Sequence, residues 1–572
     1  MRFEIIDRDG LARTGELDVD GIAHKTPAMA FVDTWKYPAP EGCLKLRQSS
    51  LAKEGDISIA PSGFSRFADN DDCQIEAGYR GSPFAENRHD RCYAIPDNIS
   101  ELMLNSHAFV EAVDRIKGGP DLLKPALFPV AGLPSRLALL SYCGMDLFDS
   151  IPLIMATEND LYLTTDGAIP FDKIRELPCG CVTCSDGIND RQGLLRHNIS
   201  AAESELKLIR HHIAQGRLRE LVESRIRSEP WQIQSLRLLD LEHGSLQEMH
   251  APVKGAKFVA GSKESLHRPD VARWRSRLIE RYRRPEMARI LVLIPCSARK
   301  PYSTSASHRR FREAIWNSGN AHEVHEVIVT SPLGLVPREL ELFYPAQDYD
   351  IPVTGHWDRD ERKMVEENVR WLAESQRYDM VISHLGDESD IVNAVISDFT
   401  DTSHGKPGSR ESLTKLEETI REQSPEDGPK PSRKSRAVDD VSAISRFQFG
   451  EPGGALTDGV QVRGRWPDVK IFGRDVQRGA MSQRRGMISL TLAGAESIAT
   501  RDAYCVQIED FVPKGNLFAI GVEGATDDFR IGDDVIIRHE RDIRAVGVAR
   551  MTPVEMRAAN RGEAVHIRHC AK

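Results

Sequence analysis

The chain has 572 residues, of which 40% are hydrophobic and 28% are charged, a balance typical of a globular protein with several domains. No apolar run approaches the roughly 18 residues of a membrane span, and the opening MRFEIIDRDG lacks the form of a signal peptide. The formal net charge of −10 argues against indiscriminate binding to nucleic acid, so RNA contacts should be local. We therefore expect a cytoplasmic protein that does not enter a membrane.

Short strands are expected near the N-terminus. Residues 2–32 alternate apolar and polar positions around the turn dipeptides Asp9-Gly10 and Asp20-Gly21, which is typical of antiparallel strands. Residues 100–155 mix helical and strand patterns and end in GMDLFDS, in which Asp149 is the last acidic residue.

Three of the ten cysteines stand close together. Cys179, Cys181 and Cys184 are followed by His197, which gives the complete tetrahedral ligand set of a structural Zn²⁺ ion. In a reducing compartment such a cluster indicates a metal site rather than disulfides. The alternative is three buried or free cysteines. We predict a structural zinc ion that clamps this loop to a helix running from about Ser200.

The next segments predict helices. Residues 201–227 have apolar residues at helical spacing, which favours a pair of surface helices broken near Gly216. Several arginines crowd residues 273–284. They fit either an exposed linker helix or a contact with tRNA phosphates, and the sequence does not separate the two.

The strongest chemical signal lies at the centre of the chain. Residues 290–294 are an unbroken apolar run that ends at Pro295, as expected of a strand buried on both faces. Reactive groups collect at the C-terminal edge of such sheets. The residues that follow offer a thiol, cations, a phenol, hydroxyls and an imidazole, at Cys296, Arg299, Lys300, Tyr302, Ser305 and His308. Taken singly, they fit a core thiol, a solvated loop and a helix cap; taken together, they favour a functional site.

Two further strands are predicted, at 324–330 and 379–383, with helical patterns between them. This alternation indicates a parallel α/β domain over about 286–400. Polar residues follow the strand ends again, Glu388 among them. A polar, aromatic loop over 344–357 fits packing and a substrate-facing role about equally.

The last third of the chain changes character twice. Residues 401–440 are poor in apolar residues and rich in Lys, Glu, Ser and Pro, which predicts a flexible connector around one polar helix. From residue 441 onward short strands with glycine turns dominate. Gly532, Gly547 and Gly562 are expected to supply turns and close backbone approaches in a small barrel.

The central segment resembles the archaeosine synthase family, archaeal paralogues of tRNA-guanine transglycosylase. The resemblance rests on the pattern Pro-Cys-x3-Lys-Pro-Tyr-x2-Ser-x2-His over residues 295–308. The opening is similar to that of the transglycosylases, and GMDLFDS resembles the barrel strand that carries their nucleophilic aspartate, here Asp149. The terminal segment resembles a PUA domain, a small RNA-binding barrel. The matching words of the opening are Arg8-Asp9-Gly10, Ala12-Arg13, Gly15 and Thr26-Pro27-Ala28.

This resemblance implies an α/β multidomain protein. Its expected parts are a shortened TIM-barrel-like transglycosylase domain with the zinc site (1–230), a helical linker (231–285), a parallel α/β domain specific to archaeosine synthases (286–400), a flexible linker (401–440), a small α/β module (441–500) and a C-terminal PUA β-barrel (501–572).

The implied reaction converts 7-cyano-7-deazaguanine at position 15, in the D-loop of archaeal tRNA, toward archaeosine. An amine donor, expected to be lysine, is added to the nitrile. In one version Cys296 forms a thioimidate, Lys300 or Arg299 activates the thiol, and His308 moves protons. In the other, Lys300, Tyr302 and His308 bind the donor and polarise the nitrile without a covalent step. The expected substrate-binding residues are Arg299, Tyr302 and Ser305. The PUA domain is expected to hold the acceptor stem, and a radical-SAM partner enzyme and a homodimer are further expectations.

Two departures from the transglycosylase pattern count against base exchange. The segment before Asp149 is short, and the string closest to the second aspartate motif, at residues 61–64, lacks the acid. Asp149 is then either a contact to the base or ribose in an inherited pocket, or a relic that stabilises a shortened barrel. The rival functions are an active transglycosylase that inserts the free base and a non-catalytic tRNA-binding scaffold.

Overall fold

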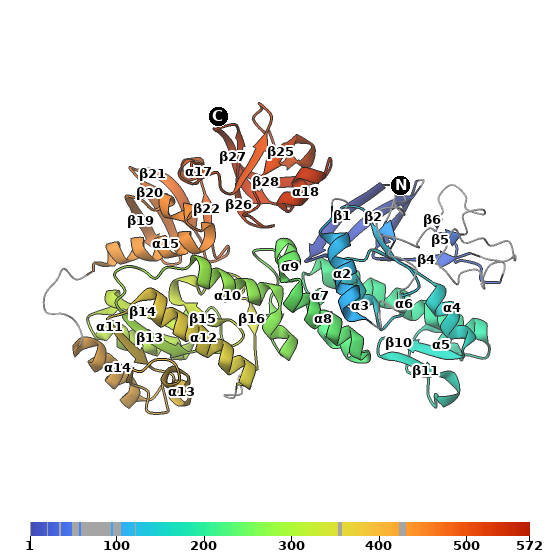
Figure 1. The fold of residues 1–572 in the computed structure, drawn as a ribbon, viewed down its shortest axis with the longest axis horizontal. Coiled ribbons are helices and arrows are strands. Elements are labelled where there is room, and N and C mark those ends of the chain that lie inside the picture. Colours follow the sequence, from blue (N-terminus) through green and yellow to red (C-terminus); the bar gives the residue numbers. More distant parts are fainter. Residues whose placement is uncertain are drawn as a thin grey trace. The chain divides into compact units, whose positions relative to one another are not determined.

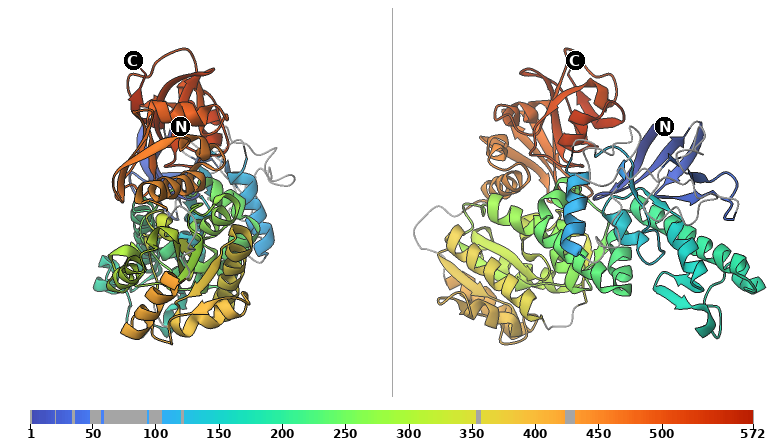
Figure 2. Two further views of the ribbon diagram at one scale, coloured as in Figure 1. Left: turned by 90° about the vertical axis from the view of Figure 1, so that its left-hand side faces the viewer. Right: turned by 45° about the vertical axis from the view of Figure 1, so that its right-hand side comes forward.

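The structure is a computed structural model. It describes residues 2–19, 21–33, 36–47, 57–58, 93–94, 105–119, 122–352, 357–422 and 431–571. The string at 61–64 and residues 353–356 of the polar loop lie outside these ranges. The chain divides into two compact units, Met1–Ala251 and Pro252–Lys572, which run from blue to green and from green to red in Figures 1 and 2.

The first unit opens with an antiparallel sheet, as its sequence predicts. The strands β1 (Arg2–Asp9), β2 (Ala12–Val19) and β3 (Ile22–Thr26) pair in the order β1-β2-β3. Gly10 has a φ of 63° in the first turn, a conformation that glycine adopts without strain. Asp20, expected in the second turn, is not among the described residues.

Six parallel strands form the second sheet of this unit, in the order β6-β5-β4-β9-β8-β7. The first three and the last three strands meet where β4 pairs with β9, as the first and last strands of a closed α/β barrel do. The prediction of a shortened TIM-barrel-like domain is thus confirmed. The strands are β4 (Ala28–Val32), β5 (Leu44–Arg47), β6 (Ile57–Ser58), β7 (Tyr93–Ala94), β8 (Ala126–Phe128) and β9 (Leu147–Asp149).

A buried ion pair ties the two sheets together. Arg13 of β2 makes two hydrogen bonds of 2.9 Å to the carboxylate of Asp146, which lies just before β9. The ammonium of Lys117 lies 3.7 Å from the same carboxylate. Bidentate pairs of this kind are geometrically specific. The arginine of the transglycosylase-like opening therefore anchors the first sheet to the strand that carries Asp149.

Helices and a β-hairpin make up the rest of the first unit as far as the structure describes it. Gly216, with a φ of 64°, separates α6 from α7 as predicted. The elements are α2 (Ser106–Lys117), α3 (Leu137–Tyr142), α4 (Ile151–Glu158), β10 (Leu161–Thr164), β11 (Gly167–Pro170), α5 (Val182–Asp186), α6 (Arg191–Ala214), α7 (Leu218–Arg225), α8 (Pro230–Glu242) and α9 (Gly244–His250).

The second unit is built on a five-stranded sheet in the order β15-β14-β13-β17-β18. The neighbours β14-β13-β17-β18 are parallel, and only β15 runs against its partner in this sheet as described. In chain order the parallel strands read 2-1-3-4, the arrangement of flavodoxin-like sheets. The three predicted strands are confirmed. The strands are β13 (Ile290–Pro295), β14 (Val324–Thr330), β15 (Gly334–Pro337), β17 (Met380–Ser383) and β18 (Thr400–Asp401).

The helix α10 (Pro269–Arg281) is packed rather than exposed. Trp274 and Leu278 are fully buried on it. The Arg275 guanidinium donates to the carbonyls of Leu266 and Pro332, and Arg281 donates to the Tyr504 hydroxyl. The segment is therefore a packed helix rather than an exposed linker, and Arg275 and Arg281 are engaged within the unit. Contact of the other arginines with tRNA phosphates stays a prediction.

The described part of residues 401–440 is also packed. Leu416 and Ile420 of α14 are fully buried in the core of the second unit, against α11. The sequence predicts one polar helix in this range but not its packing, because only one narrow stripe of α14 is apolar. The helices around the sheet are α11 (Ala306–Asn317), α12 (Arg359–Gln376), α13 (Ser389–Asn393), α14 (Arg410–Glu422) and α15 (Arg433–Phe449).

Two small sheets end the chain. The first has the order β19-β20-β21-β22 and the second the order β24-β28-β27-β26-β23-β25. A side chain at Gly547 would meet the His566 carbonyl at 2.5 Å, so the predicted close approach is confirmed there. The elements are α16 (Pro452–Leu456), β19 (Val460–Arg465), β20 (Asp468–Gly473), β21 (Val476–Met481), β22 (Ile488–Leu490), α17 (Leu492–Ala499), β23 (Cys505–Ile508), β24 (Leu517–Phe518), β25 (Val522–Ala525), β26 (Asp534–His539), β27 (Asp542–Ala549), α18 (Pro553–Ala558) and β28 (Glu563–Cys570).

Candidate active site and metal centre

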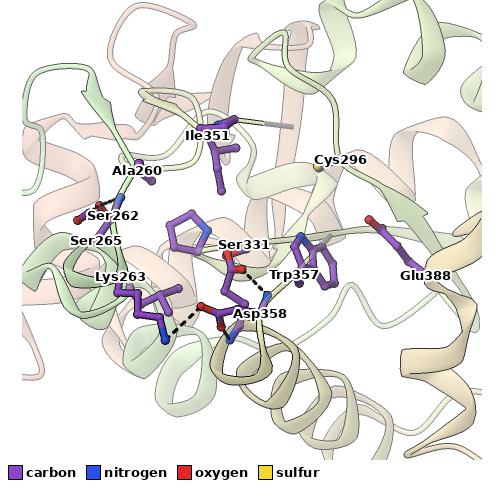
Figure 3. Close-up of a pocket in the computed structure, with 15 residues that line it drawn as sticks. Ala260, Ser262, Lys263, Ser265, Cys296, Ser331, Ile351, Trp357, Asp358 and Glu388 are labelled. Carbon is purple, nitrogen blue, oxygen red and sulfur yellow. Dashed lines mark hydrogen bonds and ion pairs between the residues drawn. The ribbon is translucent and has the colours of Figure 1, made fainter. Parts of the chain in front are cut away.

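The C-terminal edge of the five-stranded sheet holds a cavity of about 270 Å³, close to the lower end of small-molecule sites. Cys296 directly follows β13, Ser331 follows β14, and Glu388 ends a short helical turn after β17. The strands β13 and β17 flank the point where the strand order reverses, which is where such sheets bind ligands. Trp357, just before α12, lines the same cavity (Figure 3).

The thiol of Cys296 and the ammonium of Lys300 influence each other. Burial raises the pKa of Cys296; a hydrogen bond from Thr330 and the charge of Lys300 oppose that rise, and Glu388 adds to it. Burial lowers the pKa of Lys300, and its attraction to Cys296 opposes the change. The resting site therefore holds a neutral thiol next to an amine that gives up its proton more readily than an exposed lysine.

Aromatic rings and hydroxyl groups surround the Lys300 side chain. The Lys300 Nζ lies 4.0 Å from the centre of the Tyr349 ring, a cation–π contact. The Tyr349 hydroxyl is 2.6 Å from the Tyr302 hydroxyl and 2.7 Å from Thr330 Oγ1. Tyr349 belongs to β16 (Tyr349–Asp350), which pairs in parallel with β12 (Phe258–Val259). This hydroxyl chain fixes the Tyr349 ring against which Lys300 lies.

Three carboxylates line the cavity, and two of them are engaged. Asp358 accepts the backbone N–H of Glu361 at 2.9 Å, and Glu361 accepts that of Asp358 at 2.8 Å, in the capping box of α12. Glu361 also accepts the Ser331 hydroxyl at 2.6 Å. Glu388 has no hydrogen-bond or ion-pair partner among the residues that the structure describes, and burial, then Asp387, raises its pKa to about 6.

His308 does not reach this cavity. Its ring is fully buried on the core side of α11, and Nδ1 accepts a hydrogen bond of 2.8 Å from Arg338. Burial, with the charge of Arg338 next, lowers its pKa to about 2. The prediction that His308 moves protons at the site has no geometric support here, because a buried neutral ring next to a guanidinium does not take up a proton.

The remaining residues of the central motif have separate positions. Ser305 is the N-cap of α11 and accepts the backbone N–H of His308 at 3.2 Å, which is the helix-cap alternative. Tyr302 is fully buried, and its hydroxyl is 2.6 Å from that of Tyr349. Arg299 is exposed on the loop beside Lys300.

Asp149 lies in the first unit, at the end of β9. Its carboxylate is fully buried and accepts the backbone N–H groups of Val130 at 2.6 Å and Ile151 at 2.9 Å. Burial raises its pKa to about 6, and the two hydrogen bonds oppose that rise. Both oxygens are therefore engaged with the protein's own backbone, which favours a part in holding the shortened barrel together.

The predicted metal ligands come together. The ligand atoms of Cys179, Cys181, Cys184 and His197 all lie within 4.8 Å of one another. His197 Nδ1 is 3.2 Å from the Cys184 sulfur and 3.7 Å from that of Cys181. Its Nε2 lies 2.9 Å from the Leu163 carbonyl, the outer contact that orients a metal-binding imidazole. These residues fit a tetrahedral Zn²⁺ ion, for which sulfur and nitrogen ligands are preferred.

Several residues of the candidate site were not predicted as site residues from the sequence. Thr330, Tyr349, Trp357 and Glu388 lay within segments noted for their polar groups, but none was assigned a role. Thr330 ends β14 and Glu388 follows β17 closely. Their position just beyond predicted parallel strands was the available signal.

The two units match known families in their expected places. Residues 91–230 match the family described as queuine tRNA-ribosyltransferase, and residues 507–571 match the PUA domain. Residues 271–420, which hold the cavity, match a domain of unknown function (DUF5591). Within the described ranges no helix is both long and apolar enough to cross a membrane.

Curated relatives cover most of the chain. The archaeosine synthase subunit alpha of Methanosarcina acetivorans is 36% identical over 84% of this chain and 79% of its own length. The archaeosine synthase of Haloferax volcanii is 36% identical over 76% of this chain and 75% of its own length. A tRNA-guanine(15) transglycosylase of Methanothermobacter thermautotrophicus is 27% identical over 82% of this chain and 69% of its own length.

The fold and these matches define a transglycosylase-related protein that ends in a PUA domain. The two archaeosine synthases are each 36% identical to this chain over more than two thirds of both sequences, which identifies the family more narrowly. The chain belongs to the archaeosine synthase family, as its central motif predicts.

Proposed function

We propose that this protein is a tRNA-modifying transferase of archaeosine biosynthesis. Its substrate is tRNA that already carries 7-cyano-7-deazaguanine at position 15, and it adds an amine donor, with lysine the expected molecule, to the nitrile carbon. The observation that carries the proposal is the thiol of Cys296, which lines a small-molecule cavity beside Lys300 at the reversal point of a parallel sheet.

The chemistry proceeds in two steps. The Cys296 sulfur forms a bond to the nitrile carbon, one π bond of the nitrile breaks, and its nitrogen takes a proton, which gives a thioimidate. The donor nitrogen then attacks the same carbon, the carbon–sulfur bond breaks, and the thiolate leaves. The product is an amidine that contains every atom of the nitrile and the amine, so no oxidant or reductant is consumed.

Lys300 is the proposed acceptor of the thiol proton. Burial lowers its pKa, which increases the fraction of neutral amine able to act as a base. The rings of Tyr302 and Tyr349 hold the Lys300 side chain in place. Their centres lie 5.6 Å and 4.0 Å from the Lys300 ammonium nitrogen. His308 and Ser305 then serve to shape α11, and exposed Arg299 remains the proposed contact to the tRNA.

The other domains deliver the RNA. The match of residues 507–571 to the PUA domain supports binding of the tRNA there, with the acceptor stem as the proposed contact. The engaged carboxylate of Asp149 supports a structural role over base exchange. After the reaction the whole lysine donor is attached to the amidine nitrogen. The bond between that nitrogen and the lysine carbon must still be broken to give archaeosine, and this is the step proposed for a radical-SAM partner enzyme. A homodimer stays a prediction.

Mass spectrometry of nucleosides tests the proposal. The protein is incubated with cyano-deazaguanine-containing tRNA and lysine, and the tRNA is digested. The expected product is a nucleoside heavier by one whole lysine. The same tRNA unchanged with every amine would overturn the proposal, and release of guanine from unmodified tRNA would favour the rival transglycosylase.

A further inference from the structure

We propose that Glu388 binds the incoming amine as an ammonium ion and accepts the proton that this ion must lose before its nitrogen can attack. The inference rests on the proposed function, because it assigns a residue to the second step of that reaction. Glu388 is not part of the central sequence motif; it lies in the segment that follows β17.

The position of Glu388 is set by the sheet. β17 pairs with β13, with Leu293 opposite Ser383, so the segments that leave the two strands emerge side by side. Cys296 leaves β13 and Glu388 ends the turn Gly386–Glu388 after β17, and both line the cavity. In Figure 3 the Glu388 carboxylate points toward the side of the cavity that holds Cys296 and Trp357.

The other acidic groups of the cavity are unavailable. Asp358 and Glu361 hold each other's backbone in the α12 capping box, and Asp358 also lies 3.7 Å from the Lys263 ammonium. Glu388 has no such partner in the described part of the chain, although it is half-buried. A partly desolvated carboxylate without a partner is costly, and a bound cation beside an aromatic ring removes that cost. Trp357 supplies the ring.

A base is required at this point because alkyl amines are protonated near neutral pH and then have no lone pair. Burial and Asp387 raise the pKa of Glu388 to about 6, which keeps it ionised at pH 7 but makes it a better proton acceptor than an exposed glutamate. Besides Glu388, the charged and titratable groups that line the cavity are Cys296, Lys263, Asp358 and Glu361, and the Lys263 ammonium pairs with Asp358 at 3.7 Å. Asp387 raises the pKa of Glu388, and Lys300 lowers that of Cys296.

The proton and the electrons balance. The ammonium gives one proton to the Glu388 carboxylate and becomes a neutral amine. Its lone pair forms the bond to the thioimidate carbon, and the electrons of the carbon–sulfur bond leave with the Cys296 sulfur. The proton on Glu388 then returns to the thiolate, so the site regains its first state after each turnover.

The test compares Glu388→Gln with Asp387→Asn, which changes the exposed carboxylate next to it. Each protein is given cyano-deazaguanine-containing tRNA with lysine or with methoxyamine, which is largely neutral at pH 7. Glu388→Gln should lose about 10²-fold or more of the rate with lysine and keep the wild-type rate with methoxyamine. Asp387→Asn should match the wild type with both amines.

Other results have distinct meanings. Equal rates of Glu388→Gln and the wild type with lysine, or an equal loss with both amines, would overturn the role of Glu388. A wild-type protein that modifies the tRNA with neither amine would overturn the proposed function itself. A second measurement guards against a folding defect: the acidic limb of the wild-type kcat/KM profile, expected near pH 6, should vanish in Glu388→Gln.

Discussion

The Lys300 ammonium lies 4.0 Å from the centre of the Tyr349 ring, so the cation is held over an aromatic face from which it interacts electrostatically with the Cys296 thiol. A base of lowered pKa thus acts on a thiol of raised pKa, and the thiol lines a cavity that has room for a small molecule. The arrangement makes the roles of individual side chains separable by experiment.

The nucleophile is the first of these roles. Cys296→Ala should lower the rate of nucleoside modification by at least about 10²-fold, because the thioimidate cannot form. Cys570→Ala, which removes a half-buried thiol of the terminal barrel, should keep the wild-type rate. Mass spectrometry of the digested tRNA measures both. Full turnover by Cys296→Ala would favour direct attack of the amine on the nitrile.

Lys300 should control the reactivity of the thiol. Lys300→Met removes the charge that opposes the rise in the Cys296 pKa, so iodoacetamide should alkylate Cys296 more slowly at pH 8, and the pH midpoint of alkylation should move upward. Arg299→Met changes the exposed neighbouring cation and should leave the midpoint in place. Peptide mass spectrometry of alkylated Cys296 reads out both variants, and identical midpoints in all three proteins would contradict the pairing.

His308 is expected to act on stability and not on proton transfer. In His308→Leu the Arg338 N–H loses its buried acceptor, which should cost about 1–3 kcal/mol in the free energy of unfolding. His308→Asn, with an amide oxygen as a replacement acceptor, should lose less. Chemical denaturation measures the difference. Because burial holds the His308 pKa at about 2, the kcat/KM profile above pH 5 should have the same shape in any variant that folds.

The metal centre can be tested by content and by stability. Cys181→Ser should lower the zinc bound per chain and destabilise the first unit, because a structural ion contributes directly to folding. Cys43→Ser changes another half-buried thiol of that unit and should retain the metal. Elemental analysis of the dialysed proteins measures the zinc bound per chain. Equal zinc content in the two variants would exclude this ligand set.

Asp149 should make the first unit less stable as the pH rises. Its folded-state pKa of about 6 lies above the 3.8 of an unperturbed aspartate, so its stabilising contribution is complete below about pH 4 and is lost as the pH rises through about 6. A shift of this size corresponds to about 3 kcal/mol. Asp149→Asn cannot titrate, so the difference in unfolding free energy between wild type and variant should change across this window. A constant difference would contradict the assignment.

Much of the fold followed from local patterns. The apolar run before Pro295 predicted a strand buried on both faces, the two later runs predicted further strands, and all three lie parallel to one another in the structure. The serine cap of α11 was also available, because Ser305 precedes a helical pattern. The packing of the polar helix α14 was not available, since its charged residues outnumber the few apolar ones that reach the core.

The sequence by itself determined the family, the strands and the reactive residue types, because these depend on composition and on spacing along the chain. Only the tertiary structure decided which reactive groups share a cavity. Helical periodicity turns His308 into the core together with Phe311, although both follow Cys296 closely. Strand pairing brings Glu388 next to Cys296 from a distant part of the chain, because neighbouring parallel strands release their loops at one edge of the sheet.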